Sequence, residues 1–146
     1  MAMPLSDVIL VVDDDADNRE MLVVYLQTQG FTVHASPNGS TALAVADALR
    51  PRVILMDLAM AGLDGLETTR QLRANASVRD ATIIAVTGRV LATAREDAYR
   101  AGCNFFISKP YDAATLAKFI DGLLHPSAAR PPTAPPLSPE SAAAAD

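Results

Sequence analysis

The sequence is short of several features that mark particular classes of protein. Cys103 is its only cysteine, so no disulfide can form within the chain. Basic residues are outnumbered, because 12 lysines and arginines stand against 17 aspartates and glutamates and leave a formal net charge of -5. A protein that binds the phosphate backbone of nucleic acid needs a basic surface. We therefore expect no direct contact with nucleic acid.

Long apolar runs are also missing. No stretch approaches the roughly 18 apolar residues of a membrane-spanning helix. The first residues, MAMPLSD, have neither a basic segment nor a long apolar run. We expect a cytoplasmic protein that does not enter the membrane. Half of the 146 residues are apolar, which is enough for the packed core of one domain.

Short runs rich in β-branched residues alternate with longer stretches of helical spacing. Such alternation indicates an α/β fold, in which helices cover a parallel sheet. Five strands are predicted, at residues 8–12, 32–35, 53–56, 82–86 and 104–108. Three of them are apolar almost throughout, as strands buried on both faces are. The expected architecture is a doubly wound, flavodoxin-like (βα)5 sheet in the order 2-1-3-4-5, with helices on both faces.

Helices are predicted between these strands from apolar residues that recur on one face. In the first helix these residues are Met21, Leu22, Tyr25 and Leu26, and in the last they are Leu116, Phe119, Ile120, Leu123 and Leu124. A fourth helix is expected at 91–101. The residues expected at helix ends are Gly30 after the first helix, Asn38 with Gly39 before the second, Pro51 closing the second, and Asp112 capping the fifth.

The composition changes abruptly after His125. Residues 126–146 hold six of the ten prolines and almost no large apolar residue, so this tail is expected to be disordered. It is too short for a second domain, which needs roughly 50 residues. We expect an extension at 1–6, one domain at 7–125, and no attached output domain.

Three consecutive aspartates follow the first predicted strand, in the segment VILVVDDDADNREM. Ligands of a doubly wound sheet bind outside the carboxyl ends of its strands, and VILMD delivers Asp57 to the end of the third strand. Asp13 and Asp14 would meet Asp57 there and raise one another's pKa. A hard dication such as Mg²⁺, or Mn²⁺ in its place, removes this conflict because it prefers oxygen ligands. Asp15 and Asp17 are read instead as charges favoured at a helix N-terminus.

Two further strand ends carry groups suited to phosphate chemistry. The segment AVTGR offers the hydroxyl of Thr87 beside Gly88, and FFISKPY offers the ammonium of Lys109 beside Pro110. A carboxylate nucleophile, a metal, a hydroxyl and an ammonium together stabilise charge on a transferring phosphoryl group. Asp57 would then become an aspartyl phosphate.

The motifs VVDDD, LMDLAMAGLDG, VTG and SKP stand in an order and at spacings that resemble a response regulator receiver domain of bacterial two-component signalling. The resemblance runs from about Asp7 to Leu124. It implies a stand-alone receiver domain that acts as a protein-interaction switch controlled by phosphorylation. It also implies that the protein is a kinase substrate more than an enzyme, with at most slow loss of its own phosphate.

The resemblance also implies roles for individual residues. Asp13, Asp14, Asp57 and the backbone carbonyl of Ala59 would hold the metal, and Asp57 would accept phosphate from a histidine kinase or a phosphotransfer protein. Thr87 and Lys109 would sense the phosphate, and Thr87 with Phe106 would form the switch. A downstream protein would bind the face made by the fourth helix, the fifth strand and the fifth helix, and the chain would be a monomer or a weak dimer.

Several positions depart from the family's usual pattern. The family usually has proline where Ala61 stands and alanine or serine at Gly88, and often has tyrosine at Phe106. A phenylalanine switch must rest on burial of its ring, and the ring is equally compatible with a plain core role. Ala59 and Arg89 occupy the two positions that tune dephosphorylation in the family. Ala59 cannot orient an attacking water, whereas Arg89 can shield the phosphoryl group or contact a partner.

Other functions fit the same residues less well. A flavodoxin-type FMN site cradles a phosphate in its first loop, where three aspartates would repel it. A haloacid-dehalogenase-type phosphatase needs a second acid two residues beyond its nucleophile, where this chain has Ala59. A pseudo-receiver that binds partners without being phosphorylated is the remaining alternative, and the intact set of acid, hydroxyl and lysine argues against it. Cys103 is read as a small buried residue.

Overall fold

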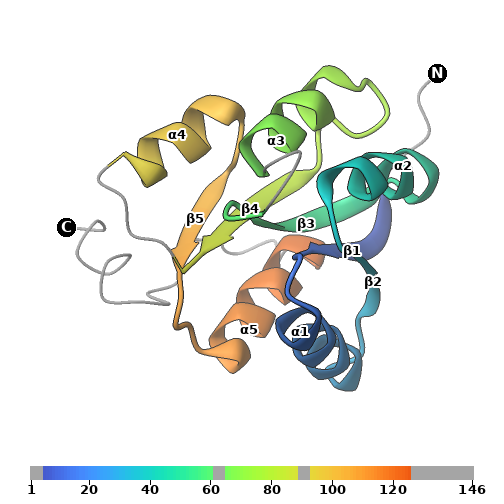
Figure 1. The fold of residues 1–146 in the computed structure, drawn as a ribbon. Helices are drawn as coiled ribbons and strands as arrows, with labels where there is room; N and C mark the ends of the chain where they lie inside the picture. The colour runs from blue at the N-terminus through green and yellow to red at the C-terminus, as the bar shows by residue number, and fades with distance from the viewer. Residues whose placement is uncertain (1–4, 61–64, 89–92, 126–146) are drawn as a thin grey trace.

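The computed structural model describes residues 5–60, 65–88 and 93–125, and strands and helices alternate through these residues (Figure 1). The strands are β1 (Ser6–Val12), β2 (Thr32–Ser36), β3 (Pro51–Asp57), β4 (Thr82–Thr87) and β5 (Phe105–Ser108). The helices are α1 (Ala16–Thr28), α2 (Gly39–Leu49), α3 (Gly65–Ala74), α4 (Ala94–Ala101) and α5 (Ala113–Leu124). The first and last residues of each predicted strand lie within two residues of those of the observed strand.

The five strands form one parallel sheet in the order β2-β1-β3-β4-β5. Its register aligns the carboxyl ends of neighbouring strands: Val12 pairs with Met56, and Asp57 pairs with Val86. On the far side of β4, Thr87 pairs with Ser108. The predicted fold class and strand order are confirmed, and the residues that follow β1, β3, β4 and β5 meet at one edge of the sheet.

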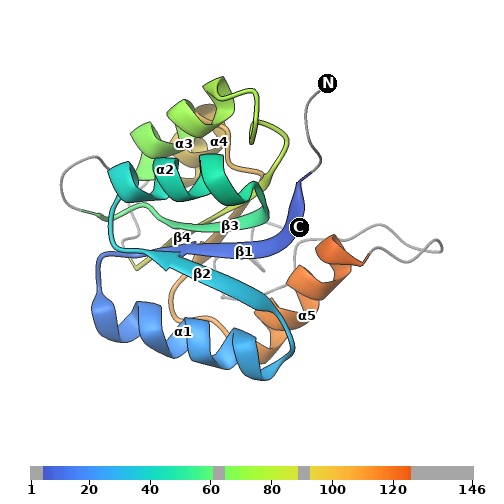
Figure 2. The same ribbon diagram turned by 90° about the vertical axis from the view of Figure 1, so that its right-hand side faces the viewer.

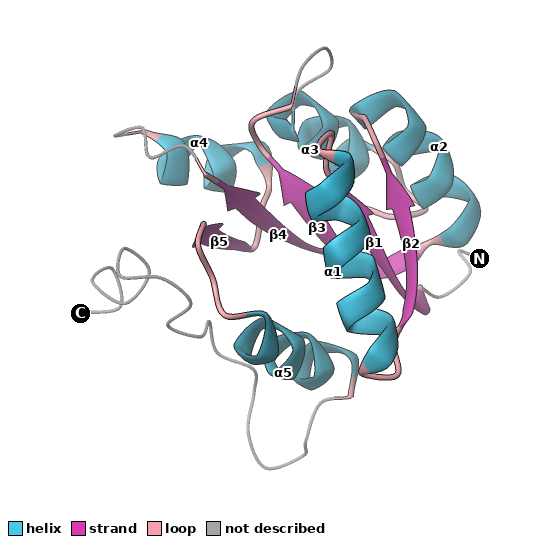
Figure 3. Cartoon of the chain, turned by 60° about the horizontal axis from the view of Figure 1, so that its bottom comes forward, coloured by secondary structure: helices cyan, strands magenta, loops and turns pink. Residues whose placement is uncertain are grey.

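The helices cover the sheet on both faces (Figure 2). Helices α2, α3 and α4 lie on one face, and α1 and α5 lie side by side on the other (Figure 3). Alternate residues of β1 therefore enter different cores. Ile9 and Val11 pack with α1 and α5, whereas Leu10 and Val12 pack with the three helices opposite. Burial on both faces explains why the central strands are apolar throughout.

Short polar side chains begin three of the helices. The carboxylate of Asp15 accepts the backbone N–H groups of Asp17 and Asn18, and Asn38 and Asp112 cap α2 and α5 in the same manner. Gly30, at a φ of 94°, follows α1 as predicted. Helix α2 ends at Leu49 with a left-handed cap at residue 50, and Pro51 is the first residue of β3.

Two details differ from the prediction, and a third cannot be compared because it falls outside the described residues. Met21 is 68% exposed, because it lies over a cavity beside the sheet edge while Leu22, Tyr25 and Leu26 pack into the core. Asn104 lies just before β5, where its side chain accepts a hydrogen bond from the backbone of Ile83. Helix α4 begins at Ala94, and the start predicted at residue 91 lies outside the described residues.

The hydropathy of the helices agrees with the lack of long apolar runs in the sequence. Among the described residues, 5–60, 65–88 and 93–125, no helix is both long enough and apolar enough to cross a membrane.

Candidate functional site

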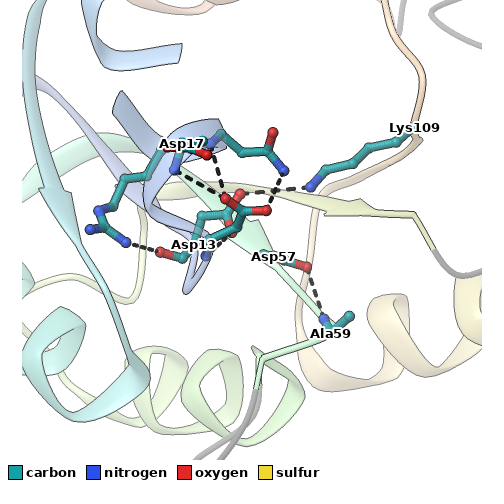
Figure 4. A network of polar contacts seen from close by, with 8 residues as sticks. Asp13, Asp17, Asp57, Ala59 and Lys109 are labelled. Atoms are coloured by element: carbon teal, nitrogen blue, oxygen red, sulfur yellow. Dashed lines mark hydrogen bonds and ion pairs between the residues drawn. The ribbon is translucent and has the colours of Figure 1, made fainter. Parts of the chain in front are cut away.

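Three carboxylates meet at the carboxyl edge of the sheet. Figure 4 shows two of them, Asp13 and Asp57, together with Lys109. Asp13 directly follows β1, Asp14 comes next, and Asp57 is the last residue of β3. One ligand oxygen from each lies within 4.8 Å of the others. Asp13 and Asp57 are 8% and 7% exposed, whereas Asp14 is exposed. The register of β1 and β3 brings together acids that are more than forty residues apart in the chain.

Backbone N–H groups hold the two buried carboxylates in place. The N–H of Asp15 donates to Oδ1 of Asp13 at 2.9 Å, and the N–H of Ala59 donates to Oδ1 of Asp57 at 2.9 Å. The guanidinium of Arg19 donates to the backbone carbonyl of Asp13 at 2.7 Å, which ties the first turn of α1 to the end of β1. These bonds orient the carboxylates toward one another despite their like charge.

The electrostatic surroundings of Asp57 disfavour its charged form. Burial is the largest cause and raises the pKa of the Asp57 carboxyl above its ordinary value, and the nearby Asp13 carboxylate raises this pKa further. The Ala59 N–H and the Lys109 ammonium act in the opposite direction but do not cancel the rise. A cation placed among these oxygens would therefore relieve a real repulsion.

Lys109 and Thr87 come from the two strands beyond β3. The ammonium of Lys109 lies 3.6 Å from Oδ2 of Asp13, and its backbone N–H donates to the carbonyl of Thr87 at 2.9 Å. The Lys109–Pro110 peptide bond is cis. Thr87 is only 2% exposed. The five predicted site residues on four strand ends thus lie at one edge of the sheet.

Two glycines lie near the site, and only one of the two positions lacks space for a side chain. A Cβ at Gly65 would collide with the backbone carbonyl of Asp57, so glycine lets the start of α3 approach the end of β3. A Cβ at Gly88 would lie 3.8 Å from Cδ of Lys109, which is an ordinary contact. Space in the protein alone therefore does not require glycine at position 88.

Phe106 lies in β5 with its ring in the core on the α4 side of the sheet. It is 5% exposed, and the guanidinium of Arg95 lies 5.0 Å from the ring centroid. This cation–π contact ties α4 to β5. Arg95 could not be predicted from the sequence, because no local pattern places a residue of a helix over a ring eleven positions later.

Tyr111 was also missed. It follows Lys109 and Pro110 directly and lines a cavity that the acidic cluster shares. Burial, and secondarily the Asp13 carboxylate, raises the pKa of its hydroxyl. Its position immediately after the SKP motif is the feature of the sequence from which it could have been predicted. Two predicted positions, Ala61 and Arg89, lie outside the described residues.

Known proteins are similar to this chain in sequence and fold. The profile of the response regulator receiver domain matches residues 9–121. Protein PilH of Pseudomonas aeruginosa is 35% identical over 116 residues, which span 80% of this chain and 96% of PilH. The structure of chemotaxis protein CheY4 of Vibrio cholerae superposes with a TM-score of 0.74 at 26% identity, covering 82% of this chain and 99% of that one.

A second solved structure is the receiver domain of sensor histidine kinase PA1611 from Pseudomonas aeruginosa PAO1. It superposes with a TM-score of 0.74 at 32% identity, and the match covers 82% of this chain and 98% of that one. A magnesium ion is coordinated in its active site cleft. Since the family profile and these relatives span most of the chain, the protein belongs to the response regulator receiver domains of two-component signalling.

Proposed function

We propose that the chain is a phosphoacceptor, which receives a phosphoryl group on Asp57 from the phosphohistidine of a kinase or phosphotransfer protein. The observation that carries this proposal is the meeting of three carboxylates within 4.8 Å beside the ammonium of Lys109. Buried like charges are costly, so a fold that assembles them gains something other than stability. The assignment of Asp57 rather than Asp13 as the acceptor rests on the match of LMDLAMAGLDG to the receiver family, in which the aspartate at this position accepts the phosphate.

The donor set fits Mg²⁺, and Mn²⁺ in the same place. Carboxylate oxygens are the ligands that a hard dication prefers, and Asp13, Asp14 and Asp57 each offer one. The related PA1611 receiver domain holds magnesium in its cleft. The backbone carbonyl of Ala59 is proposed as a further ligand. When bound, the metal would neutralise charge on the phosphoryl oxygens.

The chain's own residues then have distinct tasks. The N–H of Ala59 holds one oxygen of the Asp57 carboxylate, which orients the other as the nucleophile. Lys109 adds a positive charge at 3.6 Å from Asp13 and so offsets part of the acidic field that would repel a phosphoryl group. Thr87, buried at the end of β4, supplies a hydroxyl for a phosphoryl oxygen.

The protein acts as a substrate of phosphotransfer and loses its phosphate slowly. Ala59 has no side chain that can orient a water molecule for attack on phosphorus, and Arg89 is proposed to shield the phosphoryl group. Both residues would tune the lifetime of the phosphorylated state. Neither would make the protein an enzyme with an external substrate.

The proposed output is a change at the face formed by α4, β5 and α5. Thr87 pairs with Ser108 of β5, so movement of Thr87 toward a phosphoryl group acts directly on the strand that carries Phe106. Phosphorylation would shift a two-state equilibrium of this face and alter its affinity for a downstream protein. Phe106 has no hydroxyl, so its part in the switch rests on where the ring is buried.

The direct test is incubation with a small phosphodonor and Mg²⁺, followed by mass spectrometry of the intact protein. We expect a gain of one phosphoryl group that alkali removes, and we expect none in Asp57→Asn. Asp17→Asn is the matched control, because Asp17 lies at the start of α1. Equal phosphorylation of the Asp57→Asn protein would refute the assignment, and no phosphorylation of the parent would favour the pseudo-receiver.

Metal binding needs a separate titration. We expect weak affinity for Mg²⁺ in the parent and at least about tenfold weaker affinity in Asp14→Ala, because each carboxylate contributes to one cation. An equal affinity of the two proteins would remove Asp14 from the proposed metal site.

A further inference from the structure

A cavity of about 430 Å³ opens beside the acidic cluster, between the first half of α1 and the segment that joins β5 to α5. Its volume lies within the range of roughly 300–1,000 Å³ typical of small-molecule sites. Asp57 and Lys109 both line this cavity, which is therefore continuous with the proposed site of phosphoryl transfer. Nothing in the phosphoacceptor role described above uses this space.

Asp13 and Asn18 add polar groups to the lining, and most of its other residues are apolar or aromatic. Leu22 and Val86 line it together with the rings of Tyr25 and Tyr111. Met21 also lines it and is 68% exposed, so the cavity can be reached from solvent past this side chain. Charged groups and apolar walls thus meet in one space, as they do in sites for molecules with one charged and one apolar end.

We propose that this cavity binds the acyl group of an aromatic acyl phosphate and that Asp57 accepts the phosphoryl group of this donor. The inference rests on the proposed function and adds the class of small donor. Two tyrosine rings in the wall favour an aromatic group, because aromatic pairs gain energy beyond the area that they bury. The phosphoryl end would face the carboxylates and the cation that they hold.

The transfer balances without a further reactant. An oxygen of the Asp57 carboxylate forms a bond to phosphorus, and the bond from phosphorus to the acyl oxygen breaks. The electron pair of that bond leaves with the acyl oxygen as a carboxylate, so no proton transfer is required. Lys109 lines the cavity and carries the only positive charge among its lining residues, which complements the negative charge that develops on the leaving oxygen.

The test compares two donors, benzoyl phosphate and acetyl phosphate, in three proteins. The second-order rate constant for phosphorylation of Asp57 is measured for each donor, and the ratio of the two removes differences in expression and metal content. Ala113→Leu fills the cavity, which Ala113 lines. Ala114→Leu is the matched control, because Ala114 is the next residue of α5 and does not line this cavity.

We expect the ratio of benzoyl to acetyl rate constants to fall about tenfold in Ala113→Leu and to stay at the parent value in Ala114→Leu. The same ratio in all three proteins would overturn the inference while leaving the phosphoacceptor role intact. An unchanged ratio with slower transfer from a phosphotransfer protein would assign the cavity to a protein partner instead. Failure of both donors on the parent would refute the proposed function.

A second measurement does not depend on transfer or on the folding of a variant. Benzylphosphonate, which cannot transfer its phosphoryl group, is added to the parent protein with Mg²⁺ and observed by NMR. We expect nuclear Overhauser contacts from its ring to the methyl groups of Leu22 and Val86. Contacts at another face, or no contacts at saturation of the metal site, would overturn the inference.

Discussion

Two polar clusters lie at opposite ends of β4 and β5, and they hold charge in opposite ways. At the carboxyl ends, the acidic cluster of Asp13, Asp14 and Asp57 brings like charges within 4.8 Å. At the amino ends, the single cation of Arg73 is surrounded by acceptors. The second arrangement, which we call the Arg73 cluster, satisfies its donors, whereas the first keeps a repulsion that Lys109 offsets only in part.

The Arg73 cluster joins three separate segments of the chain. The guanidinium donates to the carbonyls of Gly102, Arg79 and Ala81 and to Oδ1 of Asn104, at distances between 2.6 and 2.8 Å. Arg73 lies in the last turn of α3, so these bonds fasten this helix to the start of β4 and to the turn between α4 and β5. One end of these strands is thus built for stability and the other for chemistry.

The largest effect on stability is expected from Arg73→Ala. The substitution removes four hydrogen bonds from a charged donor and leaves partly buried carbonyls without partners, so we expect the free energy of unfolding to fall by about 3 kcal/mol. Arg70→Ala is the control, since Arg70 lies on the same helix and forms an exposed ion pair with Glu67. Its loss should cost at most about 0.5 kcal/mol. Urea denaturation that gave equal losses would contradict the comparison.

The next effect concerns the glycine beneath Arg73. Gly102 has a φ of 118°, and a Cβ there would lie 2.6 Å from Cγ of Arg73. Gly30 has a φ of 94° and open space around it. Both alanine variants bear backbone strain of about 1 kcal/mol, and we expect Gly102→Ala to lose about 1 kcal/mol more because of the collision.

A double-mutant cycle isolates this collision. In the Arg73→Ala background, Gly102→Ala should cost no more than Gly30→Ala does, because the colliding side chain is gone. Costs that simply add would show that the Arg73 side chain does not collide with a Cβ at position 102.

The two clusters also differ in how far the sequence reveals them. The acidic cluster depends on residues directly after two buried strands, and the rule that ligands bind at the carboxyl ends of a doubly wound sheet locates it. The strand order and the caps at Asn38 and Asp112 follow from equally local patterns. These features could be predicted because the strand ends and the caps are each encoded by a few neighbouring residues. The parallel sheet then brings the carboxyl ends of the strands together at one edge.

The Arg73 cluster could not be predicted, because its acceptors are backbone carbonyls and a side-chain amide that lie far apart in the chain, from residue 79 to residue 104. The same contacts explain why Asn104 does not begin β5, since its side-chain oxygen accepts hydrogen bonds from Arg73 and from the backbone N–H of Ile83. The exposure of Met21 has a similar origin. Its spacing fits the buried face of α1, but the space beneath it is the cavity, which no pattern within one helix describes.

At the acidic cluster, Asp57→Asn should act in the opposite direction to Arg73→Ala. Without a divalent cation at neutral pH, we expect the variant to be about 1 kcal/mol more stable, because the neutral amide bears neither the cost of burial nor the repulsion from Asp13. Asp121→Asn, on the exposed side of α5, should change stability little. Adding Mg²⁺ should stabilise the parent more than the variant.

The dependence of this gain on pH follows from the raised pKa of Asp57 in the folded protein. Below the ordinary pKa of an aspartate, the carboxyl is protonated in both the folded and the unfolded states, and its charge costs nothing. As pH rises from there to the raised pKa, the unfolded state loses its proton first and the folded state is destabilised. The stability difference between parent and variant should therefore grow with pH, and a difference that shrank would contradict the assigned direction.

The smallest effect is expected at Cys103, which lies against the Arg73 cluster and tests whether that end of the sheet is chemically inert. The thiol is 6% exposed, and burial raises its pKa, although contact with Thr69 and the charge of Arg73 act the other way. A buried thiol that stays protonated reacts slowly, so iodoacetamide should label the native protein only through opening of the structure. Because this is the only cysteine, mass spectrometry reports one site.

Labelling should be at least about tenfold faster in Arg73→Ala than in Arg70→Ala, since the first substitution lowers the free energy of opening. If the native parent reacted as fast as the urea-unfolded chain, the thiol would be accessible. The amino ends of β4 and β5 would then not be chemically inert.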